Sequence, residues 1–151
     1  GLLFGSVDPQ KYESIPLPIK DSWGVLMRRD APLAQKEAIS PEDLCDQQLI
    51  ISHQRGFDRN LAGGLRRDIS HLHIVATYNL VFNASLLADE GLGYAFCLDK
   101  LINTRGSNLC FRPLSPRLEA SACIIWKKYQ VFSKAAGVFL EYLHDLIEKG
   151  G

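Results

Sequence analysis

Gly91-Leu92-Gly93 is the stretch of this sequence that most invites a chemical interpretation, as a phosphate-binding loop. A dinucleotide fingerprint places its glycines after a strand and before a helix, because the helix N-terminus attracts the pyrophosphate. Here the order is reversed, since a helical pattern precedes Gly91 and a strand-like run follows Gly93. We therefore expect Gly91 to end a helix in the left-handed conformation, with no phosphate bound at this turn.

His71 and His73 are spaced so that both face the same side of a strand, as a metal-binding pair would. No third ligand stands at a recognisable spacing, and a zinc site needs at least three protein ligands. The cysteines are scattered without a C-x-x-C pair, which favours reduced, partly buried thiols. They are Cys45, Cys97, Cys110 and Cys123. We expect no metal site and no disulfide.

Catalytic chemistry finds equally little support in the sequence. A serine nucleophile of the Gly-x-Ser-x-Gly type is absent, and no nucleophile and base stand at a recognisable spacing. We therefore expect no enzyme, no catalytic residue and no cofactor, and a binding site becomes the leading interpretation.

Polar residues stand where predicted strands end, and ligands of open parallel sheets bind outside the carboxyl ends of strands. Ser52, His53 and Gln54 follow a buried apolar run and offer a hydroxyl, an imidazole and an amide. The same rule selects the ends of two further strands. The candidate set is Phe4, Gly5, Ser6, Ser52, His53, Gln54, Thr77, Tyr78 and Asn79. The alternative for each residue is a role in a turn or a helix cap, and Asn79 in particular suits an N-cap.

Alternating strands and helices must hold these residues in place. Strands are predicted at residues 2–4, 15–19, 23–27, 49–51, 71–79, 92–98, 108–114 and 120–128. Pro16 and Pro18 limit the second of these to an edge or irregular role. Helices are predicted from Ser40-Pro41 for about two turns, around residues 60–67, over 80–90, within 98–106, and at 131–149 with one apolar side. This alternation predicts a parallel α/β sheet in the middle of the chain.

Several segments resemble the effector-binding domain of LysR-type transcriptional regulators. They are "WGVLMRRDAPLA", "ISPEDLCDQQLIIS", "NASLLADEGLGYAFCLDKLI" and "CFRPLSP", in that order. The most diagnostic pieces are residues 30–34, where the family usually has a histidine at the Ala31 position, and residues 89–94. The resemblance implies a type 2 periplasmic-binding-protein-like α/β fold, with two subdomains, crossing hinge strands and a small effector in the cleft between them.

The resemblance also implies an organisation for the chain. Residues 1–27 would be part of the first regulatory subdomain, residues 28–109 the second, and residues 110–151 the return into the first. The first subdomain is then incomplete, and the chain starts in the middle of a fold. The family's DNA contact belongs to an N-terminal winged helix-turn-helix that this sequence lacks, and the family's regulators are cytoplasmic homo-oligomers.

The charge and hydropathy of the sequence limit the kinds of partner that the chain can bind. The chain has 151 residues with 17 Lys plus Arg and 17 Asp plus Glu, so no basic field is available to hold DNA. No apolar run is long enough to span a membrane. His53, Arg55 and Arg28 favour a small organic anion as the effector. A periplasmic-type solute-binding protein is the alternative function, and self-pairing through an exposed edge such as residues 2–4 is a further, structural one.

Overall fold

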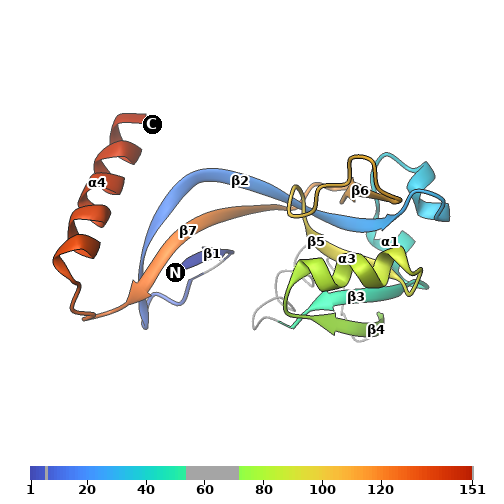
Figure 1. Ribbon diagram of the computed structural model, residues 1–151, viewed down its shortest axis with the longest axis horizontal. Coiled ribbons are helices and arrows are strands. Elements are labelled where there is room, and N and C mark those ends of the chain that lie inside the picture. Colours follow the sequence, from blue (N-terminus) through green and yellow to red (C-terminus); the bar gives the residue numbers. More distant parts are fainter. Residues whose placement is uncertain (6, 54–71, 151) are drawn as a thin grey trace. The chain divides into compact units, whose positions relative to one another are not determined.

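The computed structural model describes residues 1–5, 7–53 and 72–150 (Figure 1). Contacts divide the chain into two compact units, one formed by Gly1–Asp21 with Ala120–Gly151 and the other by Ser22–Glu119. The predicted boundaries after residues 27 and 109 both fall inside the second unit. The helix predicted around residues 60–67 lies outside the described residues.

The first unit combines strands from both ends of the chain. Strand β1 (Leu2–Phe4) pairs antiparallel with β7 (Glu119–Lys127), and the first part of β2 (Tyr12–Arg28) follows β7 in the strand order. Helix α4 (Lys134–Gly150) closes the chain. It has the predicted apolar side, but none of its residues is buried.

Strand β2 corrects one prediction. The sequence suggested two extended pieces, whereas the structure has a single strand of 17 residues that runs through both prolines. Residues two apart direct their backbone N–H positions to the same edge of a strand, so Pro16 and Pro18 remove donors from one edge only. A strand tolerates proline on such an edge.

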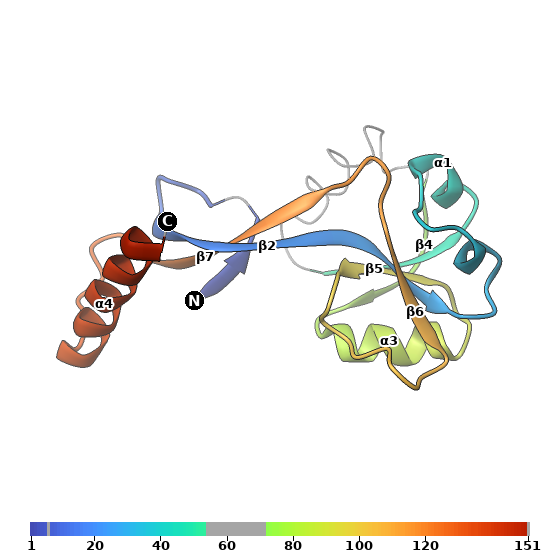
Figure 2. The same ribbon diagram turned by 90° about the horizontal axis from the view of Figure 1, so that it is seen from above.

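The second unit is a mixed sheet in the order β6-β2-β5-β3-β4 (Figure 2). Strand β3 (Gln48–Ser52) is parallel to β4 (His73–Tyr78) and to β5 (Tyr94–Leu98). The parallel arrangement predicted for the middle of the chain is therefore confirmed. The second half of β2 is antiparallel to β5 on one side and to β6 (Leu109–Pro113) on the other.

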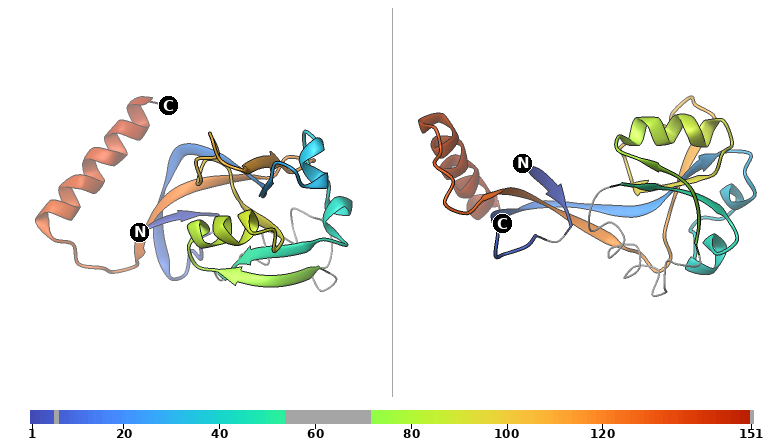
Figure 3. Two further views of the ribbon diagram at one scale, coloured as in Figure 1. Left: turned by 45° about the vertical axis from the view of Figure 1, so that its right-hand side comes forward. Right: turned by 90° about the horizontal axis from the view of Figure 1, so that it is seen from below.

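Helices and short turns cover this sheet (Figure 3). Helix α3 (Val81–Asp89) packs on one face through a buried cluster that takes Leu26 from β2 and Ile50 from β3. A 3-10 turn, η1 (Pro32–Gln35), and a one-turn helix, α1 (Pro41–Leu44), follow β2. Helix α1 begins as predicted at Ser40-Pro41 but is shorter than the expected two turns.

The end of α3 confirms the prediction for Gly91. This residue has a φ of 78°, its N–H donates to the carbonyl of Ala88, and the N–H of Leu92 donates to the carbonyl of Leu87, both at 3.0 Å. This pair of hydrogen bonds is the Schellman arrangement that ends helices at glycine.

The helix predicted within residues 98–106 is wrong, because Leu98 ends β5 and residues 99–106 form turns and bends. Lys100 and Gly106 have positive φ angles, of 62° and 70°, which no helix allows. The side-chain oxygen of Asn103 accepts a hydrogen bond from the N–H of Arg105 at 3.1 Å. Asparagine thus offers the backbone a local alternative to the helix. Among the described residues, no helix is long and apolar enough to cross a membrane.

Candidate ligand-binding site

The carboxyl ends of β3 and β4 lie side by side in the second unit. The parallel register pairs Ile51 with Thr77 and Ser52 with Tyr78. One step further, the N–H of His53 donates to the carbonyl of Tyr78 at 2.8 Å. The structure therefore brings Ser52, His53, Thr77, Tyr78 and Asn79 to one edge of the sheet, which we call the strand-end edge.

Three side chains of this edge are exposed, those of His53, Thr77 and Asn79, and Ser52 is half-buried. The N-cap alternative for Asn79 is wrong, because Leu80 is the N-cap of α3 and makes no side-chain cap bond. The edge offers an imidazole, two hydroxyls and an amide, all of which can donate hydrogen bonds. Such donors suit a ligand with oxygen acceptors.

Tyr78 contributes to the edge with its backbone and not with its phenol. Its side chain is only 8% exposed and belongs to the buried cluster under α3. The hydroxyl donates to the carbonyl of Phe96 at 2.8 Å. Burial raises the pKa of Tyr78 well above its usual range, and the Cys97 thiol adds to this. The phenol is therefore neutral and committed to the core.

The remaining predicted residues lie elsewhere or outside the described part of the chain. Phe4 pairs with Ala122 in the first unit, and Gly5, with a φ of 116°, donates its N–H to the carbonyl of Ser121 at 3.2 Å. Ser6 and Gln54 are not among the described residues. A role for these four residues in ligand binding stays a prediction.

Sequence reasoning missed three polar residues next to the strand-end edge. Asp99 follows β5, which is the parallel neighbour of β3. Its N–H donates to the carbonyl of Ser22 at 2.9 Å, and the Nε of Arg117 donates to the Ser22 hydroxyl at 3.0 Å. The sheet rule, applied to β5, would have selected Asp99. Ser22 and Arg117 carry no signal in the sequence, because only the fold brings them to Asp99.

Arg28 is not part of this edge, contrary to its predicted role in attracting an anion. It ends β2, which runs antiparallel to β5, so it lies at the opposite edge of the sheet. Its guanidinium donates two bonds of 2.8 Å to Asp30 and one of 2.9 Å to the carbonyl of Asp89. The bond to Asp30 raises the pKa of Arg28 and lowers that of Asp30. Arg55 lies outside the described residues.

Metal binding finds no support in the part of the chain that the structure describes. It contains no group of three His, Cys, Asp or Glu side chains arranged to hold an ion. His73 stands alone at the amino end of β4, and His71 is not described. None of the four cysteines forms a disulfide, and three of them are buried.

Comparison with known proteins gives a consistent result. The sequence matches the family described as LysR substrate binding domain over residues 1–148. The effector-binding domain of QuiR, solved in complex with shikimate, has a TM-score of 0.79 at 18% identity, with 98% of this chain and 71% of that chain covered. The regulatory domain of CcmR from Synechocystis PCC6803, in complex with 2-PG, has a TM-score of 0.75 at 18% identity, with 97% and 72% covered.

A longer relative sets the scale of the match. HinK, a LysR family transcriptional regulator from Pseudomonas aeruginosa, has a TM-score of 0.71 at 16% identity, with 97% of this chain but only 52% of that chain covered. The chain thus spans about half the length of this regulator. No curated protein sequence matches significantly. The fold is that of the type 2 periplasmic binding proteins, and the chain belongs to the LysR substrate-binding domain family.

Proposed function

We propose that this chain is the ligand-sensing domain of a cytoplasmic LysR-type transcriptional regulator, and that it is not an enzyme. The family match over residues 1–148 carries this proposal. Ligand binding would bias the conformation of a DNA-bound oligomer, with DNA held by a winged helix-turn-helix elsewhere in the regulator. We further propose that residues 28–109 act as one regulatory subdomain and that residues 1–27 and 110–151 act together as the other.

The proposed effector is a small organic anion that binds at the strand-end edge. His53, Thr77 and Asn79 present exposed donors there, and the described residues place no acceptor on the His53 ring or the Asn79 amide. Donors of this kind recognise carboxylate oxygens. QuiR was solved with shikimate, a hydroxylated carboxylate. This chain shares the fold of QuiR at 18% sequence identity. We propose that it binds a ligand of the same chemical class.

Isothermal titration calorimetry of the 151-residue chain tests ligand sensing. The ligands would be a panel of small carboxylates, shikimate included, and a panel of neutral sugars of similar size would serve as the control. We expect saturable binding of at least one carboxylate and none of the sugars. Saturable binding of a neutral sugar alone would instead favour a solute-binding protein and contradict the proposed effector class.

The complete gene separates the two classes of binding protein. A winged helix-turn-helix encoded upstream of this chain supports the regulator. A secretory signal in the same place supports the periplasmic-type solute-binding alternative, because transport proteins of that kind must be exported.

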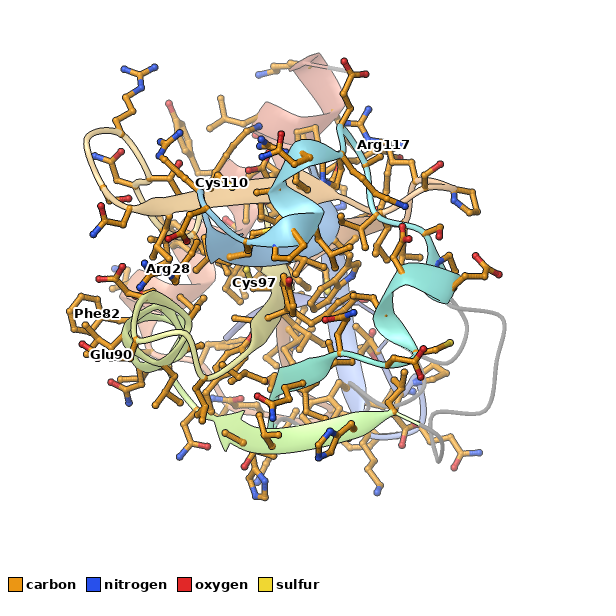
Figure 4. All side chains as sticks on the ribbon, turned by 90° about the vertical axis from the view of Figure 1, so that its right-hand side faces the viewer. Arg28, Phe82, Glu90, Cys97, Cys110 and Arg117 are labelled. Atoms are coloured by element: carbon orange, nitrogen blue, oxygen red, sulfur yellow. The ribbon has the colours of Figure 1, made fainter. Side chains whose placement is uncertain are left out.

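We also propose that the chain self-associates through the outer face of α3. This helix is apolar on both sides: Ala84 and Ala88 are buried against the sheet, while Phe82 and Leu86 are 62% and 51% exposed. Figure 4 shows Phe82 on the outer side of the helix. Large apolar side chains exposed together on one helix mark a surface that a partner covers, and a second copy of the chain supplies the same apolar surface.

A further inference from the structure

A polar groove in the second unit begins next to the strand-end edge, at Asp99, and shares no residue with that edge. It has a volume of about 380 Å³, within the range of small-molecule sites. Its lining residues come from the start of the buried part of β2 and the residue after its end, from the turns after β5, and from β6 and the segment after it. Those used below are Ser22, Arg29, Asp99, Thr104, Arg112 and Arg117.

The groove carries an excess of positive charge. It is lined by three guanidinium groups and one carboxylate. Among the described residues, no carboxylate lies within ion-pair distance of Arg29, Arg112 or Arg117, unlike Arg28, which pairs with Asp30. Guanidinium groups stay charged at all relevant pH values. The described lining of the groove therefore carries a net positive charge, which the single carboxylate of Asp99 offsets only in part.

Two of these arginines are fixed in place by backbone carbonyls. Arg29 donates to the carbonyls of Ser107 and Thr104, both at 2.9 Å. Arg112 donates to the carbonyls of Lys36, Ala34 and Phe111 at 2.8–3.0 Å. These bonds hold the charges in position without neutralising them. Such preorganised charge favours binding because little side-chain freedom remains to be lost.

Among the three arginines of the groove, Arg117 has the most N–H donors left for a ligand within the described chain. Only its Nε has an acceptor among the described residues, the hydroxyl of Ser22. Ser22 is only 7% exposed and so is held in place by its surroundings. The bond to its hydroxyl therefore fixes the position of the guanidinium and of its two Nη groups. Asp99 follows β5 beside Ser22, and its carboxylate accepts just the N–H of Lys100 within the described chain. Arg117, labelled in Figure 4, follows β6 in the chain.

We infer that this groove is a second ligand site, and that it binds a small anion through a carboxylate or phosphate group held by Arg117. A guanidinium fork binds either group with two parallel hydrogen bonds. Asp99 accepts a hydrogen bond from a hydroxyl of the same ligand, so hydroxylated anions fit best. The site shares no residue with the strand-end edge, and it stands whether or not that edge binds an effector.

Binding at this groove joins the first and last segments of the second unit. Ser22 is the first residue of the unit and Arg117 lies just before its end at Glu119. The N–H of Trp23 already donates to the carbonyl of Leu118 at 2.8 Å. A ligand on Arg117, Ser22 and Asp99 adds bonds between the same segments. Since it binds only the folded unit, it raises the unfolding temperature.

Nuclear magnetic resonance titration of the 151-residue chain tests the inference. One arm uses inorganic phosphate and the other malate, each at constant ionic strength against sodium chloride. We expect saturable shifts of the amides of Ser22, Asp99 and Arg117. A response to phosphate alone assigns the site to phosphorylated ligands, and a response to malate alone assigns it to carboxylates. If neither anion shifts these amides beyond chloride, the inference is overturned.

Matched variants separate a binding role of Arg117 from a structural one. Arg117→Gln should weaken binding of the responding anion about tenfold, and Arg117→Lys should retain part of the affinity. Arg105→Gln is the control, because Arg105 is exposed in the same unit and does not line the groove. If Arg117→Gln and Arg105→Gln lose the same amount of affinity for the anion, the effect is non-specific electrostatics, and the proposed site is overturned. If Arg117→Gln does not fold, Arg117→Lys and the wild-type shifts decide.

The two proposals fail separately. Shifts confined to His53 and Asn79 would contradict the groove and support the strand-end edge. Shifts confined to Ser22, Asp99 and Arg117 would support the groove and contradict the strand-end edge.

Discussion

Asp43 is the residue that connects the start of α1 to its surroundings. Its carboxylate accepts hydrogen bonds from the N–H and hydroxyl of Ser40, at 2.9 and 3.0 Å, and pairs with the Lys36 ammonium. The bond from Lys36, followed by that from the Ser40 N–H, lowers the pKa of Asp43. The folded pKa is thus below the unfolded one. The contribution of Asp43 to the free energy of unfolding is therefore complete above the pKa of the unfolded state, about 3.9. It is lost as the pH falls through the lower pKa of the folded state.

Substitution of Asp43 tests this reading. We expect Asp43→Asn to lower the free energy of unfolding by about 1 kcal/mol at pH 7, as for the loss of a capping box. The difference from wild type should shrink below about pH 4, where the wild-type carboxylate is itself protonated. Urea unfolding at several pH values measures it. The exposed Asp46 gives the control variant Asp46→Asn, and a deficit that does not change with pH would refute the assigned cause.

At the residue scale, the sequence was informative where one local rule decides the outcome. The Ser40-Pro41 helix start and the left-handed Gly91 follow from such rules, as does the polar end of β3 at His53. Tyr78 shows the limit, because the choice between a phenol in the site and a phenol in the core depends on how α3 packs. Arg28 was misjudged for a related reason: strand direction, which no local pattern carries, puts it at the opposite edge of the sheet.

At the element scale, the passage from α3 into β5 contains two glycines with different tasks. Gly91 needs its positive φ, so Gly91→Ala should cost about 1 kcal/mol of unfolding free energy. Gly93 needs space, because an added Cβ would lie 2.5 Å from the carbonyl oxygen of Gln48 in β3. That oxygen belongs to the backbone and cannot move aside, so Gly93→Ala should cost more than Gly91→Ala.

Thermal unfolding of both variants ranks them. Gly137→Ala is the control, because this residue lies inside α4 with nothing within 4 Å of an added Cβ. There alanine should be neutral or stabilising by up to about 1 kcal/mol, since it favours helices. A Gly93→Ala variant as stable as Gly137→Ala would contradict the close approach of β5 to β3.

Some helices and strands could be predicted from the sequence and others could not. The strands from β3 to β6 and the terminal helix were predictable because their apolar patterns agree with their local punctuation. The prolines suggested a break in β2, yet both fall on one edge and the strand continues. The segment 98–106 has helical composition, but Asn103 and the positive φ of Lys100 turn the chain instead.

At the scale of the whole molecule, self-association can be measured directly. We expect the chain to form dimers or larger oligomers in light scattering after size exclusion, and Phe82→Lys to shift it towards monomer. Asn83→Lys, which adds the same charge at the next exposed position of α3, should leave the mass unchanged. A wild-type monomer at all concentrations would refute self-association through α3.

The central claim is that the strand-end edge binds a small organic anion. The most direct test is calorimetric titration of wild type, His53→Ala and His73→Ala with whichever carboxylate of the panel binds most tightly. The two histidines are exposed at opposite ends of neighbouring parallel strands. We predict about tenfold weaker binding for His53→Ala, from the loss of a charge-assisted hydrogen bond, and unchanged binding for His73→Ala. Equal affinities of the two variants, or no carboxylate bound by wild type, would contradict the claim.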